Sequence, residues 1–359
     1  SWLYKFFMKK KIALIIGVTG QDGSYLAEFL LKKKYIVYGM VRRSSMPNTQ
    51  RIDHILAPDR FLELKPGKIR REYGDLSNSS QIQNLIQKIK PDEIYNLGAQ
   101  SHVAVSFEIP EYTSDVVGLG TLRVLEAIRN IKPNIKFLQA SSSEMFGNSK
   151  FKKQDEKTPF SPSSPYATAK VMGYWTTRNY RANHNIFASN VIMFNHESPR
   201  RGVNFVTKKI VRALCEIKIN KKKVLFLGNI DSVRDWGYAK EYCEMLWKIL
   251  QQKKPDDFVI STNKKCTVRK FAEQVGNELG FNIVWKGQKE KEVGIDKKTN
   301  RIIIKIDKAF YRPNDVSYLL GDSKKAKRIL KWKPKTSLKE LIKIMVNREL
   351  YLISKNRFY

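Results

Sequence analysis

Two short segments of the chain carry side chains that could transfer a proton during a hydride-transfer reaction. A Ser-Ser-Ser-Glu run ends one apolar stretch and supplies Ser142 and Glu144, and a Tyr-Ala-Thr-Ala-Lys run after Pro165 supplies Tyr166 and Lys170. The tyrosine and the lysine are one helical turn apart and therefore face the same way. The lysine could hold a ribose and favour the phenolate, while the serine could hydrogen-bond a substrate hydroxyl. Oxidation of an alcohol needs no further acid or base, so Glu144 indicates an additional proton abstraction, from carbon.

A glycine-rich turn near the start of the chain has the spacing of a dinucleotide-binding loop. It follows the first apolar run and opens a helix predicted to begin at Ser24. Glycines at these places allow a tight turn and close backbone approach to a pyrophosphate, which the helix N-terminus favours. The candidate cofactor contacts in this turn are Gly17, Val18, Thr19, Gly20, Gln21, Asp22 and Gly23.

The second apolar run ends in four residues that indicate which dinucleotide is bound. An NAD-binding chain usually has an acid there for the ribose hydroxyls, whereas this chain has Arg42, Arg43, Ser44 and Ser45. Two arginines and two hydroxyls suit a 2′-phosphate, which predicts NADP; the alternative interpretation is an exposed basic turn. After the third run, Asp75 and Leu76 could meet the adenine of the dinucleotide. After the fourth run, the residues that could line the cofactor are Leu97, Gly98, Ala99, Gln100 and Ser101.

The elements that position these residues alternate along the first half of the chain. Predicted strands cover residues 13–17, 36–41, 69–73, 93–97, 136–141 and 186–193, and predicted helices cover 24–34, 79–89, 120–131 and 166–183. This alternation predicts parallel βαβ units, hence an α/β fold with a doubly wound parallel sheet. Functional residues should then gather at the carboxyl ends of the strands. The second half is more mixed and has no internal repeat.

Composition narrows the class of protein. A chain of 359 residues can form two lobes. Its net charge of +33 would ordinarily suggest a nucleic-acid-binding protein. The lysines are spread along the chain, however, without a basic helix or an RNA-binding signature, so we expect no nucleic-acid partner. Such a field would also attract an acidic, diphosphate-bearing ligand.

The sequence predicts no membrane-spanning segment, no signal peptide and no metal site. The longest apolar runs are of strand length, far below the roughly twenty residues that span a bilayer, so no membrane association is predicted. The apolar opening of the chain lacks the flanks of a signal peptide. The three cysteines have no paired spacing and no two histidines stand at a metal-binding interval. We therefore expect a reducing, cytoplasmic location and no metal.

The motifs together resemble those of the GDP-mannose 4,6-dehydratases, within the extended short-chain dehydrogenases. Matching strings lie at residues 17–28, 41–45, 96–103, 194–202, 227–237 and 311–316, of which Asn-His-Glu-Ser-Pro-Arg-Arg-Gly is the most specific. The resemblance extends from about Lys11 to Leu350. It implies an NADP-binding Rossmann domain over residues 9–195, with a return segment near 237–262, and a smaller mixed α/β domain for the nucleotide sugar over 196–236 and 263–359.

The resemblance also implies a reaction and the residues that perform it. Tyr166 would take the proton of the mannose C4 hydroxyl, held by Ser142, while hydride passes to NADP; Glu144 would then remove the C5 proton and water would leave from C6. Return of the hydride to C6 gives GDP-4-keto-6-deoxy-mannose, a precursor of GDP-fucose or another deoxyhexose. The family adds Tyr112, His196 and Arg201 to the cofactor site and Asn195, Asn204, Phe205, Val206, Lys209, Gly228, Arg234 and Arg312 to the GDP-mannose site. It implies a homodimer or homotetramer.

Two positions depart from the family pattern. Ser142 replaces a threonine, so we expect looser positioning of the hydroxyl without loss of chemistry. Asp315 replaces a glutamate and is one methylene shorter, which puts any contact made there in doubt.

Three other functions compete for the same motifs. A nucleotide-sugar 4-epimerase shares the glycine turn and the Tyr-x-x-x-Lys pair but has no need of Glu144. A dTDP-glucose or UDP-glucose 4,6-dehydratase places an aspartate before that glutamate, where this chain has Ser143. A basic RNA-associated protein on a degenerate dehydrogenase fold would not need to keep the whole set of acid, base and hydroxyl groups.

Overall fold

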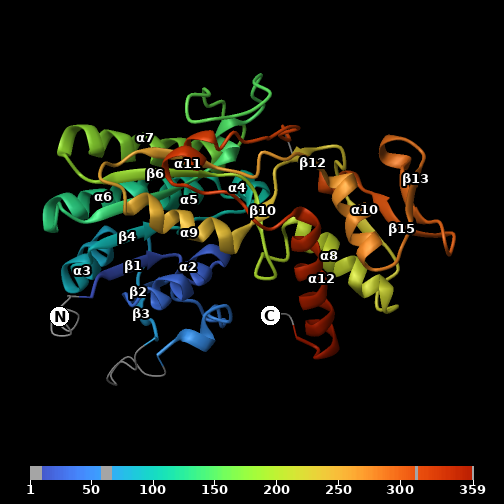
Figure 1. Ribbon diagram of the computed structural model, residues 1–359, viewed down its shortest axis with the longest axis horizontal. Coiled ribbons are helices and arrows are strands. Elements are labelled where there is room, and N and C mark those ends of the chain that lie inside the picture. The colour runs from blue at the N-terminus through green and yellow to red at the C-terminus, as the bar shows by residue number, and fades with distance from the viewer. Residues whose placement is uncertain (1–9, 58–66, 312–313, 358–359) are drawn as a thin grey trace. The chain divides into compact units, whose positions relative to one another are not determined.

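The computed structural model describes residues 10–57, 67–311 and 314–357 of the chain (Figure 1). These form two compact units. Unit 1 comprises the described residues within 1–142, 165–192 and 243–258, and unit 2 comprises those within 143–164, 193–242 and 259–359. The chain passes from unit 1 to unit 2 between Ser142 and Ser143, within the predicted catalytic run.

Unit 1 is built on a seven-stranded sheet in the order β11-β6-β5-β4-β1-β2-β3. The strands are β1 (Ile12–Ile16), β2 (Ile36–Val41), β3 (Arg70–Tyr73), β4 (Glu93–Asn96), β5 (Lys136–Ser142), β6 (Ala188–Met193) and β11 (Asp257–Ile260). From β3 to β5 every neighbouring pair is parallel. Because β1 pairs with both β2 and β4, the winding reverses at β1, and the carboxyl ends of β1 and β4 flank the crevice where such sheets bind ligands. The predicted doubly wound parallel sheet is confirmed.

Helices cover both faces of this sheet. On one face α3 (Ser79–Ile89), α6 (Gly120–Ile131) and α7 (Pro165–His184) pack side by side, and Leu14 and Ile16 join the buried cluster beneath them. Alternation along β1 turns Ala13 and Ile15 to the opposite face, which α2 (Gln21–Lys32) covers. There α2 contacts α9 (Ala239–Leu250), gold in Figure 1, which returns to unit 1 late in the chain.

The element boundaries agree closely with the hydrophobic patterns, with two informative differences. The structure gives α3 and α6 the predicted bounds, but α2 begins at Gln21 instead of Ser24 and ends at Lys32 instead of residue 34. Gly20 is extended and forms the N-cap, so the helix starts inside the glycine turn, and Lys34 has a φ of 66°, which ends it. Residues 103–119, for which no element was predicted, form α4 (Val103–Glu108), α5 (Pro110–Thr113) and the π-helix η2 (Ser114–Leu119).

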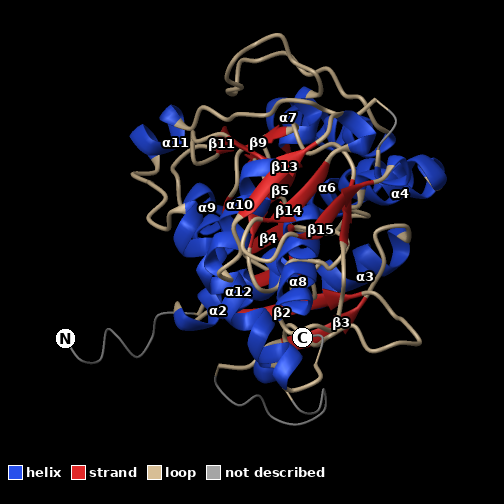
Figure 2. Cartoon of the chain, turned by 90° about the vertical axis from the view of Figure 1, so that its right-hand side faces the viewer, coloured by secondary structure: helices blue, strands red, loops and turns tan. Residues whose placement is uncertain are grey.

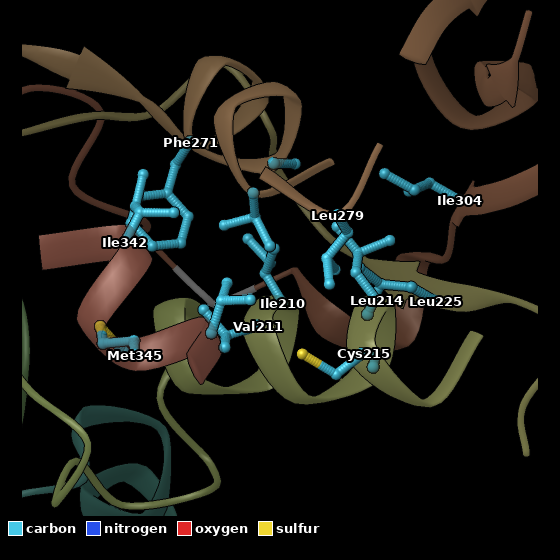
Figure 3. Close-up of a cluster of buried hydrophobic side chains, with 14 of the residues drawn as sticks. Ile210, Val211, Leu214, Cys215, Leu225, Phe271, Leu279, Ile304, Ile342 and Met345 are labelled. Carbon is cyan, nitrogen blue, oxygen red and sulfur yellow. The ribbon is translucent and has the colours of Figure 1, made fainter. Parts of the chain in front are cut away.

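Unit 2 has its own core, in which α8 (Val206–Lys218), α10 (Val268–Glu278) and α12 (Leu338–Ser354) pack against one another. Figure 3 shows Ile210 of α8 on the side of Phe271 and Ile342, and Leu214 of α8 beside Leu225 and Leu279. A four-stranded mixed sheet in the order β13-β14-β15-β8 accompanies these helices. Its strands are β13 (Ile283–Lys286), β14 (Val293–Asp296), β15 (Arg301–Ile306) and β8 (Leu225–Leu227).

Short elements complete the structure (Figure 2). Two-stranded pairs join β10 to β7 and β12 to β9. The bounds are β7 (His196–Glu197), β9 (Val233–Arg234), β10 (Gly237–Tyr238), β12 (Cys266–Thr267), α11 (Lys324–Ile329), η1 (Asp53–Ile55), η3 (Ser143–Phe146), η4 (Lys289–Lys291) and η5 (Lys308–Phe310). Within the described ranges, no helix combines the length and the apolar character that a membrane span requires.

Candidate active site

The candidate residues fall into two sets, one in each unit. In unit 1 they follow the carboxyl ends of parallel strands, which lie along one edge of the sheet: residues 17–23 after β1, 42–45 after β2, 75–76 after β3 and 97–101 after β4, with Ser142 ending β5. The topology therefore brings together segments that are far apart in the sequence, as the sequence predicts for a doubly wound sheet.

The glycine turn after β1 is tightly packed. A Cβ on Gly17, whose φ is 84°, would lie 2.8 Å from the Gly98 backbone nitrogen, and a Cβ on Gly23 would lie 2.3 Å from the Gly17 carbonyl oxygen. Gly20 is the N-cap of α2 and has no side chain to cap the first amide groups of the helix. The turn thus fits a pyrophosphate, with helix amides directed at the anion and no side chain in the way.

The end of β2 and the end of β3 form a basic corner of unit 1. Arg42 is exposed and its guanidinium donates to the hydroxyl of Tyr112 on α5. Arg43 is also exposed, and its guanidinium lies 5.7 Å from the ring centroid of Tyr73. Both arginines are held at the surface by aromatic side chains of neighbouring elements, an arrangement that suits a phosphate on the adenosine ribose.

The other strand-end candidates shape the loops. The Asp75 carboxylate accepts from the backbone and hydroxyl of Ser77 and so closes a turn, and Leu76 is buried behind it. Gln100 exchanges hydrogen bonds with the backbone of His102 at the start of α4. Leu97 continues the β4 ladder with one more bond to Ile16.

Tyr166 and Lys170 lie together in the first turns of α7, as their spacing predicts. The Lys170 ammonium is 5.7 Å from the Tyr166 ring centroid and donates to the carbonyl of Ala140 on β5, at 2.7 Å. Only 4% of Lys170 is exposed. Burial lowers the pKa of Lys170 to about 8, with a partial opposite effect from Asp22. A positive charge is thus held in a poorly solvated place beside the ring of Tyr166.

One part of this edge had no signal in the sequence. Arg123 on α6 donates to the carbonyl of Leu76 at 2.9 Å and pairs with Asp115 of η2. An arginine on a predicted amphipathic helix is expected to be solvated. The spacing of residues in the sequence also gives no indication that α6 contacts the loop after β3.

In unit 2 the backbone after Glu144 is closely constrained. Glu144 is half-buried in the one-turn helix η3, and its carbonyl accepts from Gly147. Gly147 has a φ of 54°, and a Cβ there would lie 1.8 Å from the Ser161 carbonyl oxygen. Phe146 packs between Phe160 and Phe194. These contacts fix the turn that carries the carboxylate.

The segment from Asn195 to Arg201 is organised by a buried carboxylate. Glu197 is 1% exposed, accepts from the Thr207 hydroxyl, and lies 3.0 Å from Arg201 Nε in an ionic contact that is not aligned as a hydrogen bond. The Arg201 guanidinium stacks 3.6 Å from the ring centroid of Phe205. The buried Oδ1 of Asn195 has no hydrogen-bond partner within the described residues.

His196 is held beside this segment on β7. Its Nδ1 lies 2.7 Å from the carbonyl of Phe194, and its ring packs 5.2 Å from that of Tyr242. Asn204 is exposed, while Phe205 and Val206 lead into α8.

Lys209 and Gly228 meet at the same aromatic residue. The Lys209 ammonium lies 3.3 Å from the Phe310 ring centroid, and a Cβ on Gly228 would lie 2.4 Å from the Phe310 carbonyl oxygen. Burial and the nearby Lys222 lower the pKa of Lys209 to about 8, with Asp307 acting in the opposite direction. The structure therefore joins two predicted substrate residues from distant segments.

Arg234 is nearly buried on β9 and faces the residue that departs from the family pattern. Its guanidinium donates to the Val233 carbonyl at 3.0 Å and lies 3.8 Å from an Asp315 carboxylate oxygen. The other carboxylate oxygen of Asp315 accepts from the Ser232 hydroxyl at 3.2 Å. The shorter side chain thus reaches the arginine only at the limit of an ion pair. Arg312 lies outside the described residues.

Most of the chain is similar to proteins of one family. A family model described as GDP-mannose 4,6 dehydratase matches residues 14–345. The chain is 49% identical to "GDP-mannose 4,6 dehydratase" of Cricetulus griseus over 97% of its own length and 93% of that relative. It is 50% identical to "GDP-mannose 4,6-dehydratase" of Vibrio cholerae over 96% of its own length and 94% of that relative.

Solved structures share the fold at much lower identity. A dTDP-glucose 4,6-dehydratase from Bacillus anthracis in complex with NAD superimposes with a TM-score of 0.77 at 19% identity, covering 97% of this chain and 98% of that one. A UDP-glucose 4-epimerase from Thermotoga maritima gives the same TM-score, 0.77, and covers 96% of this chain and 99% of that one. The resemblance expected from the motifs is confirmed by the much closer sequence relatives, and the chain belongs to the GDP-mannose 4,6-dehydratase family.

Proposed function

We propose that this chain catalyses the reaction for which its family is named, the conversion of GDP-mannose to GDP-4-keto-6-deoxy-mannose and water. The observation that carries the proposal is the pair on α7: Lys170 is buried as a cation against Tyr166 and tethered to the end of β5, next to the strand terminus that bears Ser142. A buried ammonium is unfavourable for a scaffold and useful for an acid–base site.

The residues of unit 1 fit a nicotinamide dinucleotide, which we propose is NADP. The glycine turn would hold the pyrophosphate, Arg42 and Arg43 the 2′-phosphate, and Lys170 the nicotinamide ribose. His196 and Arg201 are proposed as further contacts from unit 2. When bound, this cofactor accepts hydride from C4 of the sugar and returns it to C6, so the overall reaction is redox-neutral.

The side chains of the chain perform the proton transfers. Tyr166, as phenolate, takes the proton of the C4 hydroxyl while Ser142 hydrogen-bonds that hydroxyl, and C4 becomes a ketone. The ketone acidifies the C5 proton, Glu144 removes it, and the C6 hydroxyl leaves as water after protonation. A proton returns to C5 as C6 is reduced, which balances the loss of one water from the substrate.

Unit 2 supplies the proposed substrate contacts. Arg234 has a guanidinium suited to the diphosphate by charge and by its forked geometry. The free Oδ1 of Asn195 suits a sugar or ribose hydroxyl. The remaining proposed contacts are Asn204, Phe205, Val206, Lys209, Gly228 and Arg312. In domain terms we propose dinucleotide binding by residues 9–195 with 237–262, and nucleotide-sugar binding by 196–236 and 263–359.

The substrate assignment is tested by incubating purified protein with GDP-mannose, UDP-glucose and dTDP-glucose in parallel. We expect a product lighter by one water, with the alkaline absorbance of a 4-keto sugar, from GDP-mannose alone. Water loss from UDP-glucose or dTDP-glucose but not from GDP-mannose would refute the assignment. Epimerisation without water loss would instead favour a 4-epimerase.

The cofactor assignment has a separate test. Protein purified without added nucleotide is denatured and the released nucleotide is identified by chromatography and mass. We expect NADP(H); release of NAD(H) would overturn the role given to Arg42 and Arg43.

We also propose self-association, as a homodimer or homotetramer, through the outer surface of unit 1. Large apolar side chains are exposed on contacting elements: Leu119 of η2 at 39%, and Met172 and Trp175 of α7 at 38% and 53%. Neighbouring patches of this kind on a folded protein mark an interface. Sedimentation should give at least a dimer, and W175E with M172E should give a monomer; a monomeric parent protein would refute this.

A cytoplasmic location is consistent with the thiols. All three cysteines are buried thiols, which fits a reducing compartment. Fractionation of cells that express the tagged chain tests this, and recovery with exported proteins would contradict it.

A further inference from the structure

We infer that Arg123 is a positioning residue for the adenine end of the dinucleotide, acting through the loop after β3. The inference rests on the proposed function, because in a bound dinucleotide the adenine would meet the candidate contacts Asp75 and Leu76. It assigns a role to a side chain outside the glycine turn, the basic corner and the catalytic pair.

The contacts of Arg123 connect three segments of unit 1. Its Nη1 donates to the Leu76 carbonyl at 2.9 Å and to the Asp115 carbonyl at 3.2 Å. Its Nη2 donates to the Asp115 carboxylate at 2.7 Å. One planar guanidinium on α6 therefore holds the backbone of the cofactor loop and the first turn of η2 at fixed positions, as its rigid fork of donors permits.

The side chain of Leu76 is constrained as closely as its carbonyl. A Cβ on Gly98 would lie 2.8 Å from Leu76 Cδ1, and a Cβ on Gly120 would lie 2.9 Å from Leu76 Cβ. The leucine is only 4% exposed. Two glycines thus leave room for this side chain and little more, and the Arg123 bond fixes the peptide that follows it, so the loop has one position when the contact is intact.

Asp115, which accepts twice from the guanidinium, lies in the first turn of the π-helix η2. A π-turn widens the helix and changes which carbonyls are used within it, and such turns are frequent at functional sites. Just before η2, Tyr112 accepts from Arg42. The segment between Tyr112 and Arg123 therefore contacts the loop after β2 at one end and the loop after β3 at the other, which are the two loops proposed to flank the adenosine.

The charges of Arg123 and Asp115 decide which part of the cofactor is affected. Because Arg123 is already paired with a carboxylate at 2.7 Å, it adds little net charge to the basic corner. It should therefore position the adenosine irrespective of the 2′-phosphate, whereas Arg42 should matter only when that phosphate is present. This difference separates positioning by Arg123 from direct phosphate binding.

The test is nucleotide binding by protein stripped of cofactor, measured by fluorescence titration with NADPH and with NADH, and by calorimetry with GDP-mannose. The variants are R123M, R123K and, as a matched control on the same helix, R129M, because Arg129 is exposed and pairs with Glu126. D115N tests the same contact without altering Arg123. R42M serves as the reference for loss of phosphate recognition.

We expect R123M to weaken the binding of NADPH and the binding of NADH alike, by about tenfold, because a charge-assisted hydrogen bond to a binding loop is lost. R123K should recover part of the lost affinity, and D115N should weaken the binding of both nucleotides by about threefold. R129M should have the same nucleotide affinities as the parent protein. The affinity for GDP-mannose should be unchanged in all of these variants. R42M should weaken the binding of NADPH but not that of NADH.

Three results would overturn the inference. They are equal behaviour of R123M and R129M, loss of NADPH affinity alone, and equal loss of GDP-mannose affinity, which would indicate general damage to the fold. If R123M does not fold, the D115N result decides by the same criteria. A parent protein that binds neither nucleotide would refute the proposed cofactor site itself, and so is distinguishable from failure of the Arg123 inference.

Discussion

Replacing Lys170 by methionine should stabilise the protein at neutral pH while abolishing its chemistry. The ammonium is nearly buried, and burial lowers the pKa of Lys170 to about 8. Methionine has similar length and no charge, so it fits the same space without the cost of a buried cation. Lys170, the proposed active-site lysine, is thus expected to weaken the fold that holds it, a common trade between stability and function.

The magnitude follows from the difference between the folded and unfolded pKa values. An unfolded lysine titrates near 10.4, about 2.5 units above the folded value, and at about 1.36 kcal/mol per unit this amounts to about 3 kcal/mol against the folded state. Methionine also loses the hydrogen bond to the Ala140 carbonyl, which reduces the gain by about 1–2 kcal/mol. We expect K170M to be more stable by about 1–2 kcal/mol at pH 7.

The stability difference between K170M and the parent protein should depend on pH. The unfavourable contribution of Lys170 is fully present below pH 8, where both states keep the proton. Between about pH 8 and 10.4 the unfolded lysine keeps a proton that the folded one has lost, so the parent protein gains stability as pH rises. The advantage of K170M should shrink by about 1.4 kcal/mol per pH unit across this window and disappear within it.

The assay is urea unfolding of cofactor-free protein at pH 7, 8 and 9, with loss of C4 oxidation measured in parallel. K88M is the matched control, since Lys88 on α3 is exposed and pairs with Glu72; its stability difference from the parent should be small and independent of pH. If K170M is less stable than the parent at pH 7, or if the difference does not change with pH, the reasoning about the buried cation is wrong.

Three further predictions concern other buried or reactive groups. E144Q should still oxidise C4 but lose dehydration by about 10²–10⁴-fold, as removal of a general base predicts; unchanged water release, followed by product mass, would exclude Glu144 from the mechanism. Lys208 and Glu349 form a buried ion pair at 2.5 Å, so K208M alone should cost about 3–5 kcal/mol in urea unfolding and K208M with E349L much less; equal losses would mean that the charges are not coupled. Burial raises the thiol pKa of Cys215 to about 12 and of Cys266 to about 11, so a thiol reagent at pH 8 should label the cysteines only on unfolding; rapid labelling of native protein would contradict this.

The candidate catalytic residues and most of the predicted elements of unit 1 could be identified in the sequence because their signals are local. Strand and helix periods depend on neighbours two to four residues apart, which is why α3 and α6 have the predicted bounds. The glycine turn and the Tyr166–Lys170 spacing are local in the same sense. The start of α2 was predicted too late because a glycine N-cap gives no side-chain signal.

Contacts between distant segments depended on the tertiary structure. Strand order brings Gly17 against Gly98, a π-helix that no pattern predicted places Asp115 beside Arg123, and burial on all sides shifts the pKa of Lys170. Each of these results from packing among elements far apart in the chain, where the identity of a residue does not state its partner. The sequence by itself therefore determined which groups could react and on which elements they lie, while only the tertiary structure decided which side chains hold them in place.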